Sequence, residues 1–274
     1  MERSCFSEKT LTLSVLTAEF ARCVLQTGAP VTTRSLFFQS LPMTLALVLI
    51  TALTAGAEQR ADSFLGTDLR SRVVCGGLGL WFVWEAVETF RQAQELCWEN
   101  FSSMAMLGLL PLLLWAGWKL EPAVLVRCAP ILCWAAALAS LLCLLGLNGQ
   151  FHWEKLMLPT EPLTLTLPLY PEYFALPLFC PAKQVRCAVW LPVKAFILAG
   201  SFALCTELVF GAGNALPGIE LLRAGRLGSI CRFDALVLLV WLAAAMFRFC
   251  VLVQVVRQLA GRLWGRATPA EENV

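Results

Sequence analysis

Residues 234–256 read DALVLLVWLAAAMFRFCVLVQVV, an apolar run that only Asp234, Arg248 and Gln254 interrupt. A helix needs about 20 mostly apolar residues to cross the hydrocarbon core of a bilayer, which is roughly 30 Å thick. The run meets that length, so we predict that it forms a membrane-spanning helix. The rest of the chain, on the N-terminal side of this segment, is also rich in apolar residues.

The composition of the whole chain is that of a membrane protein. Apolar residues make up 58% of the 274 residues, charged residues make up 15%, and the mean hydropathy is +0.71. A globular domain carries about 25% charged residues, so this chain has too little polar surface to cover a water-soluble core. The net charge of +2, with no long basic run, excludes a nucleic-acid partner, and the composition excludes disorder and collagen-like repeats. We therefore expect an integral membrane protein, with the lipid bilayer as its principal partner.

The same test of length and apolarity predicts about eight spans. They cover residues 11–27, 40–57, 73–94, 103–118, 123–147, 162–181, 188–212 and 234–256. Prolines interrupt the sixth of these segments. The predicted fold class is an all-α membrane protein, with one polytopic membrane domain over residues 1–264 and a short cytoplasmic tail over residues 265–274.

Lysine and arginine are distributed unevenly between the predicted connecting segments. If the N-terminus lies inside the cell, the cytoplasmic segments carry about twice as many basic residues as the outer segments. Short cytoplasmic loops of membrane proteins are enriched in these residues. We therefore predict that both termini are cytoplasmic, which requires an even number of spans.

The residues that membrane enzymes use for catalysis are scarce in this sequence. His152 is the only histidine, and the motifs G-x-S-x-G, H-E-x-x-H and the phosphate-binding loop are absent. The twelve cysteines form no C-x-x-C pair and lie mostly in apolar runs, as expected of small hydrophobic residues in helix contacts. We expect no enzyme activity, no cofactor and no metal site.

Ionisable residues interrupt several of the predicted spans. Glu85, Glu88, Arg91 and Glu95 recur every three or four residues and would share one face of a helix, while Glu207 and Arg248 lie in later spans. One interpretation is a polar seam around a substrate cavity, because an ionisable group inside a membrane is expensive and commonly functional. The other is that the charges at positions 88, 91 and 95 lie near the outer end of their helix and are simply hydrated.

Two predicted spans are short or broken. The first ends in Gln26-Thr27-Gly28-Ala29-Pro30, and the sixth is interrupted around Tyr170-Pro171-Glu172-Tyr173-Phe174. Free backbone groups at such breaks, helped by the helix dipole, can bind the carboxylate and ammonium of an amino acid, as in transporters. The alternative interpretation is a frayed first helix and a proline-rich external loop.

A family resemblance is carried by the stretch from Gly211 to Trp241, which reads GAGNALPGIELLRAGRLGSICRFDALVLLVW. It resembles the B subunits of spore germinant receptors, the GerAB-type spore permease family within the amino acid–polyamine–cation transporter superfamily. That family has a proline, an arginine several residues later, an E-R-apolar-D/E box and an apolar helix with a tryptophan. Here these positions are Pro217, Arg223, Arg232, Asp234 and Trp241. Cys231 stands where the family usually has the glutamate of the box.

The resemblance implies a LeuT-like fold of two inverted five-helix repeats. It implies a location in the bacterial cell membrane, and in spores in the inner membrane. It also implies germinant receptor A and C subunits as partners and a small nutrient, often an amino acid, as ligand. Family members typically continue through two further helices, so the second repeat is expected to be incomplete here. The expected ligand-binding residues are Gln26, Thr27, Gly28, Glu85, Tyr173 and Phe174; the expected structural or gating residues are Pro217, Arg223, Arg232 and Asp234.

Three functional hypotheses follow from these patterns. The leading one is a permease-like subunit that senses a nutrient germinant and passes a change of state to its partner subunits. The second is an amino-acid permease that acts in transport. The third is a family member that has lost ligand binding.

Overall fold

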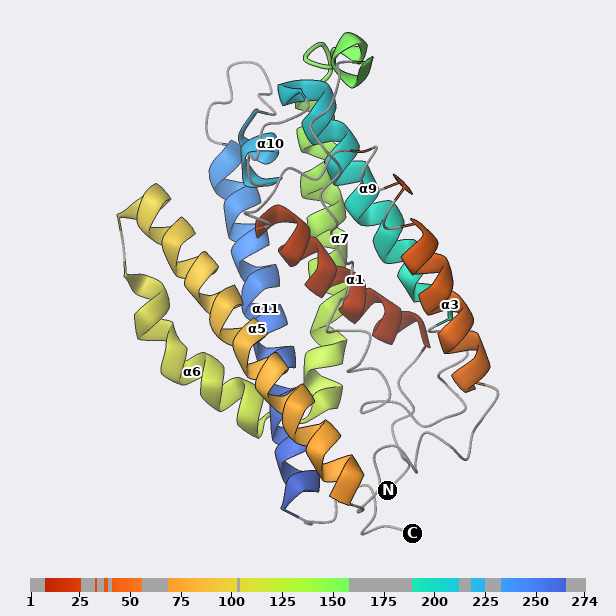
Figure 1. Ribbon diagram of the computed structural model, residues 1–274. Helices are drawn as coiled ribbons and strands as arrows, with labels where there is room; N and C mark the ends of the chain where they lie inside the picture. Colours follow the sequence, from red (N-terminus) through yellow and green to blue (C-terminus); the bar gives the residue numbers. More distant parts are fainter. Residues whose placement is uncertain are drawn as a thin grey trace.

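The computed structural model describes residues 8–25, 33, 37–38, 41–55, 69–102, 104–157, 189–211, 218–224 and 233–264. Every regular element in this part of the chain is a helix (Figure 1). The elements are α1 (Glu8–Leu25), α3 (Leu41–Ala55), α5 (Leu69–Phe101), α6 (Ala105–Lys119), α7 (Pro122–Gly146), η2 (Trp153–Met157), α9 (Leu191–Phe210), α10 (Gly218–Ala224) and α11 (Phe233–Leu263).

Four of these helices are long and apolar enough to cross a membrane. Their candidate spans are Arg72–Phe101 in α5, Pro122–Gly146 in α7, Leu191–Phe210 in α9 and Ala235–Gly261 in α11. The predicted spans 11–27, 40–57 and 103–118 form the helices α1, α3 and α6, which do not meet the same criterion of length and apolarity. The predicted sixth span, 162–181, and the tail, 265–274, lie outside the described residues, so the count of eight spans stays a prediction.

Helix boundaries follow from local sequence. Pro122 begins α7 at a position where its missing N–H leaves no helical hydrogen bond unmade. Gly211 ends α9 with a φ of 90°, a conformation that side chains rarely adopt, and its N–H still donates to the carbonyl of Glu207 at 2.8 Å. The turn between α5 and α6 contains Ser102 at a φ of 48°, whose N–H donates to the carbonyl of Trp98 at 2.9 Å.

The two longest helices, α5 and α11, form an antiparallel pair. Phe90 packs on Phe249 with ring centroids 5.7 Å apart, and a side chain at Gly76 would contact Leu263. The start of α5 therefore lies beside the end of α11, as Figure 1 shows. Helix α6 also packs against α11, where Gln254 donates to the carbonyl of Leu120 at 3.1 Å.

Helix α1 is largely buried, and it crosses in front of α7 in Figure 1. Ala21 and Val24 are completely buried, and Phe20 packs on Phe202 of α9 with centroids 5.8 Å apart. The hydroxyl of Thr17 lies 3.4 Å from the carbonyl of Ala129 in α7. Helix α1 thus packs against helices that are much later in the sequence.

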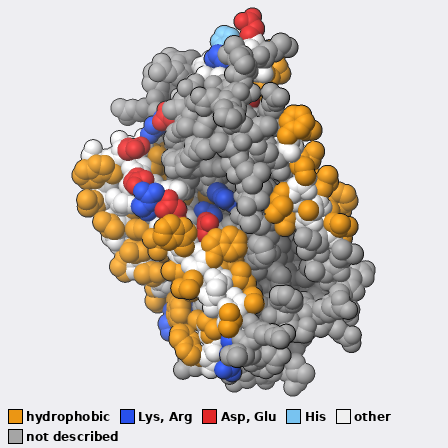
Figure 2. Space-filling view, in the orientation of Figure 1, with side chains coloured by type: hydrophobic (Ala, Val, Ile, Leu, Met, Phe, Trp, Pro, Cys, Tyr) orange, Lys and Arg blue, Asp and Glu red, His pale blue; other side chains and the backbone are white. Residues whose placement is uncertain are grey.

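The outer surface of the molecule is apolar. Large hydrophobic side chains such as Leu80, Ile131 and Trp134 are each more than 70% exposed. Figure 2 shows such side chains over much of the described surface on both sides of the view. A water-soluble protein rarely exposes so much contiguous apolar area, whereas lipid chains can cover it. The structure therefore supports an all-α integral membrane protein.

Basic residues gather at one end of the bundle. Arg257 of α11 donates to the carbonyl of Trp118 at the end of α6, and the short turn after Lys119 leads to α7, whose first turns carry Arg127. The start of α5, with Arg72, lies near the end of α11. This is the end that the distribution of lysine and arginine predicts to be cytoplasmic.

Candidate functional site

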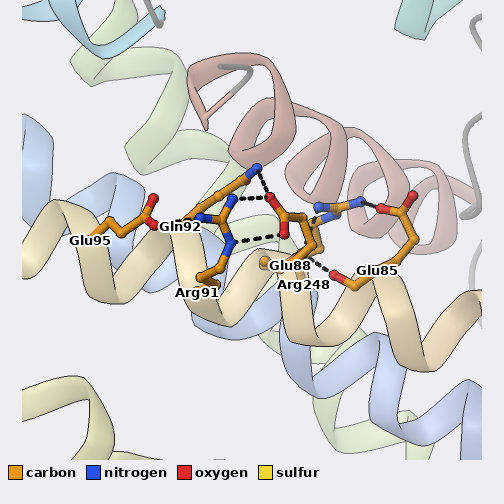
Figure 3. A network of polar contacts seen from close by, with 7 residues as sticks. Glu85, Glu88, Arg91, Gln92, Glu95 and Arg248 are labelled. Carbon is orange, nitrogen blue, oxygen red and sulfur yellow. Dashed lines mark hydrogen bonds and ion pairs between the residues drawn. The ribbon is translucent and has the colours of Figure 1, made fainter. Parts of the chain in front are cut away.

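A buried ion pair joins the two central helices α5 and α11 (Figure 3). The guanidinium of Arg248 lies 3.0 Å from Oε2 of Glu85, and its second terminal nitrogen donates to Oγ1 of Thr89 at 2.7 Å. The side chain of Arg248 is 3% exposed and that of Glu85 is 20% exposed. The pair therefore lies within the bundle but can be reached from the side of the carboxylate.

The antiparallel packing of α5 and α11 creates this cluster. Glu85 and Thr89 are four residues apart, so they lie on the same face of α5. The hydroxyl of Thr89 also donates to the backbone carbonyl of Glu85 at 2.7 Å, which orients its oxygen lone pairs toward Arg248. Both α5 side chains thus converge on a single guanidinium from the facing helix.

The energetics of such a pair favour a functional role over a purely structural one. Removing two charges from water is expensive, and a buried ion pair is commonly no more stabilising than well-packed apolar residues of similar volume. Ionisable residues inside membrane spans are rare and are usually associated with binding sites or pathways for polar solutes. An Arg–Glu–Thr cluster between two spans is therefore the strongest candidate site among the described residues.

A second buried carboxylate, Glu207, lies in the last turn of α9. Glu207 is only 6% exposed, and its Oε2 accepts a hydrogen bond from the backbone N–H of Thr33 at 2.8 Å. The sequence placed Glu207 in the same polar seam as Glu85. The structure instead shows it tying the end of α9 to the segment between α1 and α3.

Helix α1 carries further buried polar groups. Glu19 is 1% exposed, and Ser14 and Thr17 are buried beside it, each donating to a carbonyl four residues earlier in the helix. The sequence predicts a weak first membrane helix here, interrupted by Glu19 and Arg22, and these residues were not predicted to belong to the polar seam. The signal that could have found them is that Glu19 interrupts an otherwise apolar segment.

The other members of the α5 acidic face lie on the surface. Arg91 is paired with Glu88 at 2.7 Å and with Glu95 at 2.5 Å, and Figure 3 shows this group beside the Arg248 cluster on the same helix. The exposed fractions of these three side chains are 32% for Glu88, 55% for Arg91 and 54% for Glu95. The face that the sequence predicts is therefore divided into a buried part at Glu85 and an exposed part beyond it.

The predicted site residues are only partly within the described structure. Gln26, Thr27, Gly28, Tyr173, Phe174, Pro217 and Arg232 lie outside it, and Asp234 is in the first turn of α11 with its side chain outside the described part. Arg223 of α10 pairs with Glu220 and donates to Oδ1 of Asn100 at 2.6 Å, close to the end of α5. Since Asn100 is 15 residues from Glu85 along α5, or about 22 Å, Arg223 belongs to a different part of the bundle.

The cluster consists of one guanidinium, one carboxylate and one hydroxyl. Within the described residues no three His, Cys, Asp or Glu side chains gather closely enough to hold a metal ion. A guanidinium, a carboxylate and a hydroxyl can instead bind the two charged groups of a small zwitterion.

Comparison of the chain with protein-family models, with curated proteins and with solved structures finds no match.

Proposed function

We propose that this chain is a permease-like membrane protein that binds a small amino acid and serves as the nutrient-sensing B subunit of a spore germinant receptor. The observation that carries the binding proposal is the buried Arg248–Glu85–Thr89 cluster between two membrane-spanning helices. The sensing role, the spore inner membrane and the A and C partner subunits follow from the resemblance of residues 211–241.

The cluster has the charges that an amino acid requires. Arg248 can bind a carboxylate through two parallel N–H groups, and Glu85 can accept an ammonium group. In the described structure these two side chains neutralise each other, so that neither charge is left unpaired in the bundle. When a zwitterion binds, its carboxylate takes the place of Glu85 beside Arg248, and its ammonium group takes the place of Arg248 beside Glu85. The net charge of the interior is then unchanged.

The proposal includes the finer architecture. A LeuT-like bundle of eight spans with an incomplete second repeat requires its first helix to lie at the centre, and α1 is buried against α7, α9 and α11. The helix breaks at Gln26–Gly28 and at Tyr173–Phe174 would then complete the ligand site. Binding shifts a two-state bundle only if the ligand has different affinities for the two states.

The first test measures binding and uptake by the purified protein in liposomes. The probes are tritiated L-alanine, L-valine and inosine, added to the unmodified chain and to the variants Glu85→Gln and Arg248→Lys. Glu99→Gln is the matched control, because Glu99 is exposed near the end of the same helix. We expect saturable binding of an amino acid that is reduced at least tenfold in both cluster variants and unchanged in the control.

The outcomes separate the three hypotheses. Binding without uptake, together with loss of dipicolinic acid release from spores that lack the gene, supports the sensing subunit. Uptake by the isolated chain supports the amino-acid permease. If the protein binds none of the probes and its deletion leaves germination unchanged, it is a non-binding family member and the proposed function is wrong.

A further inference from the structure

A strip of polar side chains follows one face of α5, from the end of the helix at Phe101 to the buried pair. Its members are three or four residues apart, so they share one face of the helix. They are Glu85, Glu88, Gln92, Glu95 and Glu99. Arg91 lies beside them and bonds to both Glu88 and Glu95. We call these residues, together with Arg91, the α5 strip.

The α5 strip continues onto α10 at the end of the helix. Asn100, the next residue after the strip, accepts a hydrogen bond from Arg223 of α10 at 2.6 Å. Arg223 is paired in turn with Glu220. Figure 2 shows acidic and basic side chains along this face of the molecule, and a further group of them set deeper near the middle of the view. The charges of α5 therefore lead from the α10 end of the bundle toward its interior.

The exposed fraction of the charged side chains falls along the strip. It is 54% at Glu95, 32% at Glu88 and 20% at Glu85. Figure 3 shows these three residues in this order along α5. Arg248, which pairs with the last of them, is only 3% exposed. The open surface thus narrows toward the pair and ends at the guanidinium.

On the other side of the pair, the contact between α5 and α11 is apolar. Phe82 is one turn nearer the basic end of the bundle than Glu85 and is completely buried. Val255 and Leu259 of α11 lie about two and three turns beyond Arg248 in the same direction, and both are completely buried. All three apolar residues belong to one hydrophobic cluster. A protein interior is too closely packed to admit water, so this layer closes the pair off from the basic end.

The depth of the pair in the membrane is small on the α10 side. Arg72 begins the candidate span of α5 at the basic end. About 20 helical residues cross the hydrocarbon core, which places its other edge near Gln92. Glu85 is then about 10 Å below that edge. A short path of water is enough to hydrate a charge at this depth.

We propose that the Arg248–Glu85 pair lies at the closed end of a water-filled path that opens only toward the α10 end of the bundle, along the α5 strip. Ionisable residues inside membrane spans commonly face a water-filled cavity of this kind. The alternative is that water hydrates the outer residues of the strip and stops above the pair. The path reaches the cluster of the proposed function, but the inference depends on burial and charge alone and holds whichever solute the cluster binds.

The first measurement is the reaction of introduced cysteines with a membrane-impermeant methanethiosulfonate reagent, in sealed vesicles that hold the full chain. The thiolate is the reactive form of cysteine, and it forms in water but not in hydrocarbon. From the side on which His152→Cys reacts, Glu95→Cys, Glu88→Cys and Glu85→Cys should all react. We expect each of these three to react at least about tenfold faster than Val87→Cys. Peptide mass spectrometry separates the introduced cysteines from the native ones.

Three positions serve as references. Val87 is the matched control, because it lies at the depth of the pair and is 57% exposed but shares the apolar face of α5 with Trp84. Val255→Cys tests the inner side with a side chain of similar volume, and it should react from neither side of the membrane. His152 marks the α10 end of the bundle, where it is exposed beside η2.

The second measurement leaves the pair intact, because Glu85→Cys removes the partner of Arg248 and could disturb the fold. A water-soluble carbodiimide couples taurine, a charged amine, to carboxylates that water reaches. In the unmodified chain Glu85 should be labelled, although more slowly than Glu95. Glu19, which is 1% exposed, should stay unlabelled.

Neither measurement uses a ligand, so a failure here is separate from a failure of amino-acid binding. Label at Glu95 and Glu88, but at Glu85 in neither measurement, would show that water stops above the pair and would overturn the proposal. Reaction of Val255→Cys would overturn it as well, because the path would then pass through the bundle. So would a Val87→Cys variant that reacts as fast as Glu88→Cys, because the strip would then be no wetter than the lipid face.

Discussion

Trp241 of α11 donates its indole N–H to the backbone carbonyl of Ala21 in α1, at 3.1 Å, and both residues are completely buried. The bond joins the first and the last described helices of the chain. Trp241→Phe keeps most of the ring but removes the donor, and we expect it to lower the free energy of unfolding by about 1 kcal/mol. Trp241→Ala also leaves a cavity and should cost about 3–5 kcal/mol. Thermal unfolding in detergent, followed by the fraction of protein that stays monodisperse, measures both changes; equal effects of the two variants would contradict the role assigned to the bond.

Gly117 of α6 allows that helix to approach α11 closely. A Cβ atom at this position would lie 2.8 Å from Cβ of Val253 and 3.1 Å from the carbonyl oxygen of Cys250. Gly117→Ala therefore forces the two helices apart and should destabilise the protein by about 1–3 kcal/mol. Gly108→Ala, in the same helix with nothing within 4 Å of the added methyl group, should be neutral or stabilising by up to about 1 kcal/mol. The same unfolding assay compares the two variants. An equal loss of stability in both would show that the close contact between Gly117 and α11 is not the cause.

The Arg248–Glu85 pair should respond asymmetrically to the loss of either partner. Arg248 is almost fully buried whereas Glu85 is 20% exposed, so a guanidinium that loses Glu85 is harder to hydrate than a carboxylate that loses Arg248. We expect Glu85→Leu to lower the free energy of unfolding by about 3 kcal/mol, and Arg248→Met to lower it less. The double variant should recover much of the loss, because both charges of the pair are then removed. Glu99→Leu, at an exposed position of the same helix, is the control, and strictly additive single changes would show that the two side chains are not coupled.

The basic end of the bundle should face the cytoplasm. A membrane-impermeant maleimide added to right-side-out vesicles should label His152→Cys, which is exposed near η2 at the opposite end. It should label Glu121→Cys, in the turn between α6 and α7, only after the vesicles are permeabilised. Mapping the labelled peptides by mass spectrometry separates these sites from the twelve native cysteines. The reverse labelling pattern would invert the predicted orientation.

The sequence predicted the positions of the described long helices well and their ends less well. The predicted spans 73–94 and 234–256 correspond to the longer helices Leu69–Phe101 and Phe233–Leu263. Hydropathy detects the part of a helix that is suited to hydrocarbon, and polar turns such as the one around Arg257 continue the helix without adding to that signal. Hydropathy also does not show which apolar helix is enclosed by protein, so α1 could not be distinguished from a lipid-facing span.

Two of the three members of the candidate site were predicted, but their pairing was not. Glu85 and Arg248 were both singled out as ionisable residues within spans, yet they are 163 residues apart and nothing in their spacing indicates that they pair. Thr89 was missed, although its position four residues after Glu85 places it on the same helix face. Pairing between distant helices depends on how those helices pack, which a single sequence does not encode in a local pattern.

The position of α1 has a consequence for the synthesis of the protein and its insertion into the membrane. Ala21 emerges early, but its hydrogen-bond donor Trp241 is 220 residues later. At about 5–20 residues per second, translation takes roughly 10–40 s to supply that partner. For about the first half of this interval the nascent α1, which carries Glu19 and Arg22, lacks both α7 and α11, and for the rest of it α1 still lacks α11. The insertion machinery must therefore retain this first helix, or leave it at the bilayer surface, until the last one has been made.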